Sequence, residues 1–348
     1  MTDPAIDLSA RLDASLPTIA GLTRAPAVVL AAVVGGEMAV ACHGDPAPNV
    51  HTVFELGSIT KTFTALLLAE MVVRGEIDYD DPITAYLPDE ARPRQATGAP
   101  ITLAQLATHT AGLPRLPASF YLHALPVWLT NPYARYGLDD LYRATARTRI
   151  RHHPEGGAHY SNFGVGLLGQ LLANAVAADY RDLVLDRVCR PLGMTDTGTT
   201  PGPSCATGYR RGRPVPAWEM GALAPAGILR SSATDLLRYL EAHLHPEATP
   251  LAAAVRATQV PRVAGKDKDR ICLVWNHRSS RYGDVLFHSG GTRGFTAFLG
   301  FCPQASTGIA ALVNTMPTRR HNMIPAAYSL FKTLIREQQA AARQRVPE

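Results

Sequence analysis

Hydrophobic and polar positions along the first quarter of the chain predict three successive elements. Within residues 5–24 the regularly spaced apolar positions are Ile6, Leu8, Leu12, Leu16 and Ile19. This near-helical spacing predicts an amphipathic helix. Two short apolar runs over residues 27–42 are separated by Gly35-Gly36, which predicts a β-hairpin. Residues 62–73 are apolar almost all round, which predicts a central helix that is buried on most sides.

The middle of the chain carries few strand signals. Between residues 76 and 205, Pro and Gly positions separate segments with helical periodicity, at 102–109, 138–148, 163–178 and 180–189. Strand-like segments return late in the chain, at 271–275, 285–288, 295–301 and 308–313, and a final helix is expected over 324–343. A lone hairpin is marginal in water, so the hairpin at 27–42 is expected to pair with the late strands.

These elements predict an α+β fold. We expect an antiparallel β-sheet flanked by the N- and C-terminal helices, with an all-helical insertion between the early and late strands. The predicted sheet domain is discontinuous and comprises residues 1–75 and 206–348. The predicted helical domain spans residues 76–205.

Composition and charge narrow the function classes. Among 348 residues, 34 Lys and Arg stand against 29 Asp and Glu, so the formal net charge is +5, and 46% of the residues are hydrophobic. A chain of this composition can bury a substantial core. Because its arginines are scattered and form no runs, the sequence argues against nucleic-acid binding. No apolar run is long enough to span a bilayer.

Residues 24–42 imitate a signal peptide, because Arg24 precedes a short apolar run and an Ala-x-Ala site before Cys42. A signal peptide carries its positive charge at the extreme N-terminus, whereas this sequence has over twenty mostly polar or helical residues first. Five cysteines with no CxxC pair predict free thiols and argue against a disulfide framework. We therefore expect a cytoplasmic protein with no membrane partner.

Ser58 and Lys61 form an S-x-x-K tetrad directly before the predicted central helix. At a helix start, free backbone N–H groups favour a developing oxyanion, and residues three apart share one face. A buried lysine amine loses its proton readily and can then activate a serine hydroxyl. An N-capping serine beside a snorkelling lysine is the alternative. A second tetrad, Ser329 to Lys332, lies within the predicted C-terminal helix and is expected to be structural.

Two further motifs carry polar side chains at the ends of predicted elements. Tyr160-Ser161-Asn162 precedes a predicted helix, where a phenol can relay a proton if nearby cations lower its pKa and an Asn amide can bind a carbonyl. N-capping of that helix is the alternative. His288-Ser289-Gly290-Gly291 follows a short apolar strand, where glycines let a ligand approach the backbone. A plain Gly-Gly turn is the alternative there.

The three motifs, in this order, resemble the serine β-lactamase and penicillin-binding-protein superfamily. Within it, the chain is most similar to the branch of class C β-lactamases, D-alanyl-D-alanine carboxypeptidases, type VIII esterases and related transacylases. Further stretches carry the resemblance: Phe54 to Thr64, Asp80 to Pro88, Ile101 to Pro114 (with Thr108-His-Thr-Ala-Gly-Leu-Pro114), Pro191 to Thr197 and Pro225 to Leu229. The similarity runs from about residue 25 to 335.

The resemblance implies a role for each motif position. Ser58 matches the acylated nucleophile, Lys61 its proton acceptor and Tyr160 the residue that relays a proton to the leaving atom. Asn162 matches a substrate-amide position, while His288 and Gly290 match the strand motif. The N–H of Gly291 would complete an oxyanion hole with that of Ser58. β-Lactamases and peptidoglycan peptidases carry Lys-Thr-Gly where this chain has His288, a largely neutral side chain at pH 7.

These features predict a serine acyl-enzyme hydrolase that acts on a carboxylic ester or amide. A cytoplasmic transacylase or peptide-cyclising acyltransferase would use the same acyl-serine, and a non-catalytic binding module is a third alternative. The expected partner is a small-molecule or peptide acyl substrate, and no cofactor is expected. The acyl and leaving-group pockets are expected to depend on loops such as residues 114–136, whose aromatic side chains, Tyr121, Trp128 and Tyr133, belong either to the core or to a pocket. Glu155 lies in the Pro-Gly turn near the second motif, where a solvated position is expected, and no role is assigned to it.

Overall fold

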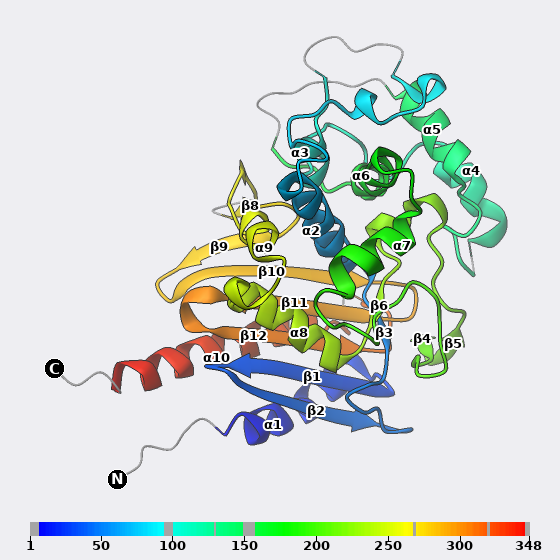
Figure 1. Ribbon diagram of the computed structural model, residues 1–348. Coiled ribbons are helices and arrows are strands. Elements are labelled where there is room, and N and C mark those ends of the chain that lie inside the picture. Colours follow the sequence, from blue (N-terminus) through cyan, green and yellow to red (C-terminus); the bar gives the residue numbers. More distant parts are fainter. Residues whose placement is uncertain are drawn as a thin grey trace.

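The N-terminal hairpin and the late strands form one antiparallel sheet, as predicted (Figure 1). The computed structural model describes residues 7–93, 100–128, 130–148, 157–266, 269–318 and 321–344. Its sheet has eight strands in the order β2-β1-β12-β11-β10-β9-β8-β7. They are β1 (Ala27–Val34), β2 (Glu37–Gly44), β7 (Val263–Ala264), β8 (Arg270–Ile271), β9 (Asn276–Ser280), β10 (Gly283–Gly291), β11 (Thr296–Cys302) and β12 (Thr307–Val313).

Strand β1 explains why the early and late parts of the chain meet. All eight of its residues are buried, and it pairs with β2 on one side and β12 on the other. A strand of Ala, Val and Leu with no polar position needs a covered face on both sides. Gly35 and Gly36 connect β1 to β2 with φ values of 58° and 89°. Glycine adopts this left-handed geometry at little steric cost, and the predicted hairpin is confirmed.

Helices cover both faces of the sheet (Figure 1). On one face, α1 (Leu8–Thr23) and α10 (Ile324–Gln344) bury Leu12 and Phe331 against alternate residues of β1. The opposite face is covered by α8 (Ala233–Leu244), which contacts β1, β11 and β12. The α+β fold with flanking N- and C-terminal helices is therefore confirmed. The helix on the opposite face, α8, was not predicted.

The remaining helices gather beside the sheet around α2 (Thr60–Val73), which is buried from Thr60 to Met71 (Figure 1). They are α3 (Leu103–Ala107), α4 (Phe120–Ala124), α5 (Leu138–Arg147), α6 (Asn162–Ala175), α7 (Tyr180–Val184) and α9 (Ala252–Thr258). Two short ladders complete the fold: β3 (Phe54–Glu55) with β6 (Arg230–Ser231), and β4 (Gly208–Arg210) with β5 (Arg213–Val215). The domain boundaries at residues 75 and 205 stay a prediction.

One predicted strand is wrong. Within the apolar run at 271–275, Ile271 ends β8, and residues 272–275 form a bend between β8 and β9, where Val274 has a φ of 67°. The N–H of Val274 donates to the carbonyl of Ala107, and residues 272–275 are all buried. The run is apolar because an irregular segment is packed in the core, which strand periodicity cannot distinguish from a buried strand.

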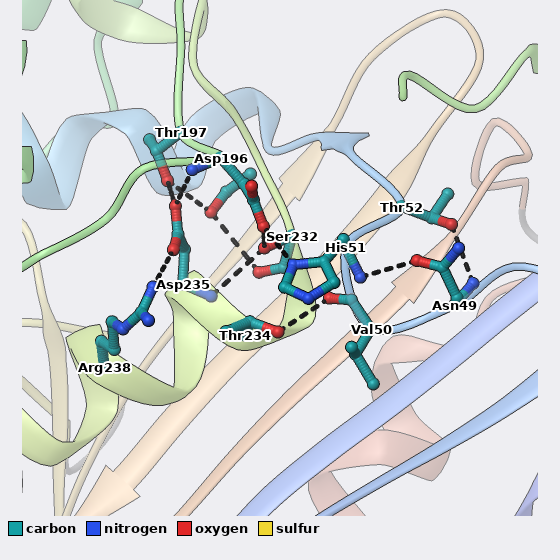
Figure 2. Close-up of polar contacts among 11 residues, drawn as sticks. Asn49, Val50, His51, Thr52, Asp196, Thr197, Ser232, Thr234, Asp235 and Arg238 are labelled. Carbon is teal, nitrogen blue, oxygen red and sulfur yellow. Dashed lines mark hydrogen bonds and ion pairs between the residues drawn. The ribbon is translucent and has the colours of Figure 1, made fainter. Parts of the chain in front are cut away.

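A polar junction ties the segment before Ser58 to the start of α8 (Figure 2). The Asp196 carboxylate accepts from the Ser232 hydroxyl at 2.8 Å and lies 2.9 Å from His51 Nδ1. The neighbouring carboxylate of Asp235 accepts from the Thr197 hydroxyl and the Asp196 N–H. These contacts join residues 49–52, 196–197 and 231–238. They anchor the chain that leads into the turn carrying Ser58.

Two further observations concern the whole described chain. None of the described helices is both long and apolar enough to cross a membrane. All five cysteines are free thiols, and three of them, Cys189, Cys272 and Cys302, are buried. Their positions in the core agree with cysteine acting as a small apolar side chain.

Candidate active site

The predicted nucleophile and base lie side by side at the start of α2. Ser58 is half-buried in a single 3₁₀ turn, Gly57–Ile59, that runs directly into the helix. Lys61 is fully buried, and its Nζ lies 2.9 Å from Ser58 Oγ. The same Nζ donates to the carbonyl oxygen of Ala226 at 2.6 Å. A backbone acceptor thus holds the amine against the serine hydroxyl.

Tyr160 approaches Ser58 from the helical part of the fold. Its hydroxyl donates to Ser58 Oγ at 2.6 Å. The next residue, Ser161, is the N-cap of α6, and its hydroxyl accepts from the N–H of Gly164 at 2.8 Å. The helix cap, Ser161, and the residue predicted to relay a proton, Tyr160, are therefore adjacent in this loop. The cap fixes the start of the helix and thereby the position of Tyr160.

Two glycines bring strand β10 against the turn that carries Ser58. A Cβ at Gly290 would lie 1.8 Å from the carbonyl oxygen of Leu56, and a Cβ at Gly57 would lie 2.7 Å from the nitrogen of Gly291. Neither distance leaves room for a side chain, so these backbones touch only because both positions are glycine. The peptide groups of Ser58 and Gly291 are consequently carried on two segments in direct backbone contact.

His288 lies on the same strand, two residues before Gly290, and is buried. Its Nδ1 lies 2.9 Å from the carbonyl oxygen of Ser289. Because a carbonyl only accepts, Nδ1 carries the proton and Nε2 carries the lone pair. The imidazole centroid is 6.4 Å from that of the Tyr160 ring. His288 therefore presents an acceptor, and no cation, beside the reactive group.

A family model described as beta-lactamase matches residues 17–330, which is most of the chain. This chain belongs to the beta-lactamase family. Its relatives include D-alanyl-D-alanine-carboxypeptidase/endopeptidase AmpH of Escherichia coli (strain K12), 28% identical over 79% of this chain and 74% of the relative. Another, named beta-lactamase, from Yersinia enterocolitica, is 26% identical over 82% of this chain and 79% of its own length.

A second relative named beta-lactamase, from Escherichia coli (strain K12), is 34% identical over 56% of this chain and 48% of its own length. The family match confirms the resemblance seen in the motifs. This beta-lactamase family member is a serine hydrolase.

Burial disfavours the charged forms of the basic side chains next to Ser58 in this family member. Burial, assisted by the charge of Arg115, lowers the pKa of Lys61 well below its usual value. Burial also lowers the pKa of His288 and of His109 to about 3, and the charge of Lys61 adds to both shifts. At neutral pH the two imidazoles are uncharged, and the amine of Lys61 is able to accept a proton.

The charge of Arg115 acts to lower the pKa of the Tyr160 phenol, but burial has the larger effect. Desolvation raises this pKa to about 12, although the hydrogen bond to Ser58 and the charge of Arg115 act in the opposite direction. Tyr160 is therefore a neutral phenol at pH 7. It can donate and relay a proton, but it is no phenolate base.

Asn162 is the first residue of α6 and is buried. Its Nδ2 donates to the hydroxyl of Tyr133 at 3.4 Å, and its Oδ1 has no partner among the described residues. A buried acceptor without a partner is costly, so Oδ1 is available to accept a hydrogen bond. Of the three loop aromatics, Tyr133 lies beside the motif, whereas the side chains of Tyr121 and Trp128 are about half exposed.

Sequence reasoning assigned no role to His109, although it lies in the segment Thr108 to Pro114. Its Nδ1 accepts from the N–H of Ser161 at 3.2 Å, and its carbonyl accepts from the N–H of His159 at 2.8 Å. Its ring packs 4.8 Å from the Tyr160 ring. His109 thus holds the peptide groups on both sides of Tyr160. The spacing between the two segments in sequence gave no signal of this contact.

The other candidates stand apart from the site. Ser329 and Lys332 of the second tetrad are exposed on α10, and Lys332 Nζ lies 5.3 Å from the centroid of the Tyr328 ring. Glu155 lies outside the described residues. Across the described part of the chain, no group of three or more His, Cys, Asp or Glu side chains is placed to hold a metal ion.

Proposed function

We propose that this serine hydrolase cleaves a carboxylic ester or amide through an acyl-Ser58 intermediate. One observation carries the proposal: Ser58 Oγ lies 2.9 Å from Lys61 Nζ and 2.6 Å from the Tyr160 hydroxyl. Because Lys61 is buried and its pKa is lowered, the amine accepts the hydroxyl proton as Oγ attacks the carbonyl carbon. The N–H groups of Ser58 and Gly291 stabilise the resulting oxyanion.

The proton then reaches the leaving group through Tyr160. As the tetrahedral intermediate collapses, the bond between the carbonyl carbon and the leaving atom breaks, and Tyr160 donates its phenolic proton to that atom. The Lys61 ammonium returns a proton to the phenol. Water then attacks the carbonyl carbon of the acyl-serine and gives up a proton to Lys61. As the bond between that carbon and Ser58 Oγ breaks, the Lys61 ammonium returns the proton to Oγ, so that the carboxylic acid leaves and the Ser58 hydroxyl and the neutral amine are regenerated.

The side chains around Ser58 indicate which hydrogen-bonding groups the substrate needs. Asn162 Oδ1 needs a donor, which the N–H of an amide substrate would supply. His288 offers an acceptor at Nε2 and no fixed positive charge, so it provides no ion pair for a carboxylate. We therefore propose esters and amides other than β-lactams as substrates. The name of the relative AmpH includes a carboxypeptidase, an enzyme that cleaves amide bonds, which supports the amide alternative.

The proposed compartment is the cytoplasm, because all five cysteines are unpaired and a reducing compartment keeps them so. Within it, acyl transfer to an amine or alcohol competes with hydrolysis for the same acyl-serine. No side chain of the described site distinguishes the two acceptors. The products formed with and without added amines distinguish hydrolysis from acyl transfer.

Turnover of p-nitrophenyl butyrate tests the proposal. Ser58→Ala is expected to lower kcat/KM by at least about 10³-fold, because the nucleophile is lost. Ser329→Ala, in the second tetrad, is the matched control and is expected to keep full activity. Intact mass of the wild type with slow acyl donors is expected to show one acyl adduct, located on Ser58 by peptide mapping. Full activity of Ser58→Ala, or an adduct on another residue, would overturn the proposal.

A further inference from the structure

The two backbone segments that carry the proposed oxyanion donors are far apart in the sequence, and one buried side chain links them. Glu55 ends β3, three residues before Ser58, and is buried. Thr292 directly follows Gly291 at the end of β10 and is buried as well. Sequence reasoning assigned no role to Glu55 or to Thr292.

Both oxygens of the Glu55 carboxylate accept hydrogen bonds. Oε2 accepts from the Thr292 hydroxyl at 2.6 Å, and Oε1 accepts from the N–H of Trp218 at 2.7 Å. Arg230 Nη2 lies 3.7 Å from Oε1 and also donates to the carbonyl of Trp218. Burial raises the pKa of Glu55, while these two hydrogen bonds and the charge of Arg230 act in the opposite direction.

The hydroxyl of Thr292 is held on its other side by the turn between β10 and β11. It accepts from the N–H of Gly294 at 3.3 Å. The N–H of Thr292 in turn donates to the carbonyl of Phe295 at 3.0 Å. Because Thr292 and Gly291 share a peptide bond, the contact with Glu55 also restricts where the peptide group of Gly291 lies.

A segment beside Glu55 holds the proposed proton acceptor too. The N–H of Leu56 donates to the carbonyl of Leu229 at 2.9 Å. Three residues earlier, the carbonyl of Ala226 accepts from Lys61 Nζ at 2.6 Å. Glu55 therefore lies where the segments 55–58, 226–230 and 291–292 meet.

A buried carboxylate costs free energy unless it is paired and hydrogen-bonded, so its presence at this meeting point needs a reason. One explanation is that Glu55 only stabilises the fold, as Asp235 does at the polar junction. The other is that its contact with Thr292 serves the reaction.

We infer that Glu55 is a positioning residue for the proposed oxyanion hole. Through the Thr292 hydroxyl, it holds the N–H of Gly291 in place relative to that of Ser58. The inference rests on the proposed acyl-Ser58 mechanism and adds to it a residue that touches no substrate. Because the oxyanion exists only in the tetrahedral intermediates, we expect an effect on acylation and deacylation and little effect on substrate binding.

Thr292→Val tests this inference, because it removes the hydroxyl and keeps the shape of the side chain. The variant is expected to lower kcat for p-nitrophenyl butyrate about 10- to 100-fold, with KM changed by less than about threefold. Butylboronic acid forms a tetrahedral adduct with a serine hydroxyl, so its inhibition constant is expected to rise by a factor similar to the loss in kcat. Thr292→Ser keeps the hydroxyl and is expected to recover most of the activity.

Glu55→Gln tests the other side of the contact. An amide has one oxygen acceptor where the carboxylate has two, so this variant is expected to lose at least as much kcat as Thr292→Val. The double variant is expected to lose less than the product of the two single losses, because both changes break the same contact.

Thr197→Val is the matched control. Thr197 is also a buried threonine that donates to a buried carboxylate, that of Asp235 at 2.8 Å. Its substitution is expected to lower the free energy of unfolding, as Thr292→Val does, and to leave kcat per folded molecule unaltered.

An unaltered kcat in folded Thr292→Val, or an equal loss in Thr197→Val, would overturn the inference and leave Glu55 a structural residue. If Thr292→Val does not fold, Glu55→Gln provides the same comparison with Thr197→Val. Full activity of Ser58→Ala would instead contradict the proposed function.

Discussion

Two regions of this molecule contain a serine hydroxyl hydrogen-bonded to a titratable side chain. At the start of α2, Ser58 is half-buried and lies between the amine of Lys61 and the phenol of Tyr160. At the polar junction, Ser232 is fully buried and donates to Asp196, which in turn contacts His51 (Figure 2). The junction contains the residue types of a Ser-His-Asp triad, but in the order Ser-Asp-His.

The difference lies in what each partner can do with the serine proton. Burial disfavours the charged form of Asp196, but hydrogen bonds from His51 and Ser232 outweigh this effect and lower its pKa, so it is a weak base. Burial of Lys61 lowers the pKa of its amine, which makes the side chain a better proton acceptor than an exposed lysine. The active site also keeps buried acceptors and donors unpaired among the described residues, such as Asn162 Oδ1 and His109 Nε2, whereas the carboxylates at the junction are paired.

The largest effect is expected when the Lys61 amine is removed from the active site. Lys61→Met is expected to lower kcat/KM for p-nitrophenyl butyrate about 10³-fold, because the proton acceptor is lost. It is also expected to raise the free energy of unfolding by about 1 kcal/mol, since an apolar side chain replaces a buried amine. Steady-state kinetics and urea unfolding measure the two quantities.

Lys332→Met, at the exposed lysine of the second tetrad, is the control for this prediction. It is expected to change the free energy of unfolding by less than about 0.5 kcal/mol and to leave turnover unaltered. Retention of wild-type kcat/KM by Lys61→Met would show that another group takes the proton.

A smaller effect, on stability instead of activity, is expected when the polar junction is disrupted. Asp235→Ala is expected to lower the free energy of unfolding by about 3 kcal/mol, because the Thr197 hydroxyl and the Asp196 N–H lose their acceptor inside the protein. Turnover per folded molecule is expected to stay within about threefold of the wild type, since these residues are structural. His51→Ala, which removes a largely exposed side chain, is expected to cost less than about 1 kcal/mol. A large loss of turnover in folded Asp235→Ala would contradict the assignment.

The smallest effect per residue is the loss of stability in acid. The pKa values of His109 and His288 are lowered to about 3 and that of His243 to about 4, mainly by burial. In the unfolded chain these imidazoles bind protons below about pH 6.5, whereas the folded protein keeps them neutral. Stability is therefore fully present above pH 6.5 and falls on acidification, by about 1.4 kcal/mol per histidine at pH 5.5.

Urea unfolding at pH 8 and at pH 5.5 measures this loss. His243 packs among aromatic rings and stands outside the active site, so His243→Phe provides the matched variant. It is expected to reduce the difference between the two pH values by about 1.4 kcal/mol. If the free energy of unfolding changes equally between the two pH values in wild type and variant, His243 does not contribute to the loss of stability in acid.

The parts of the fold that could be predicted are those with local patterning. Leu12 and Ile19 repeat at helical spacing, and Gly35-Gly36 separates two apolar runs, so α1 and the β1–β2 hairpin follow from neighbouring residues alone. Helix α8 carries a comparable signal, with Ser232 as its N-cap. It was missed because the segment around it is rich in Gly and Pro. The apolar run at 271–275 was wrongly predicted to be a strand, because a buried irregular segment is also rich in apolar residues.

The candidate site shows the same division. Ser58 and Lys61 are three residues apart, so their contact follows from helical spacing, and their distance to Tyr160 followed only from the family resemblance. Arg115 and His109 could not be found in this way, because their roles depend on contacts between loops that carry no periodic signal. The pKa of Tyr160 could not be predicted for a related reason. Desolvation depends on the whole fold, and the sequence shows only which charges are present.

The contact between Gly57 and Gly291 has a consequence for how activity arises during synthesis. The nucleophile is translated early, but one of the two amides proposed to stabilise its oxyanion belongs to a strand that leaves the ribosome more than two hundred residues later. A nascent or truncated chain without β10 therefore holds Ser58 without the second proposed oxyanion donor. The proposed oxyanion hole is complete only after this late strand has docked against the turn that carries Ser58.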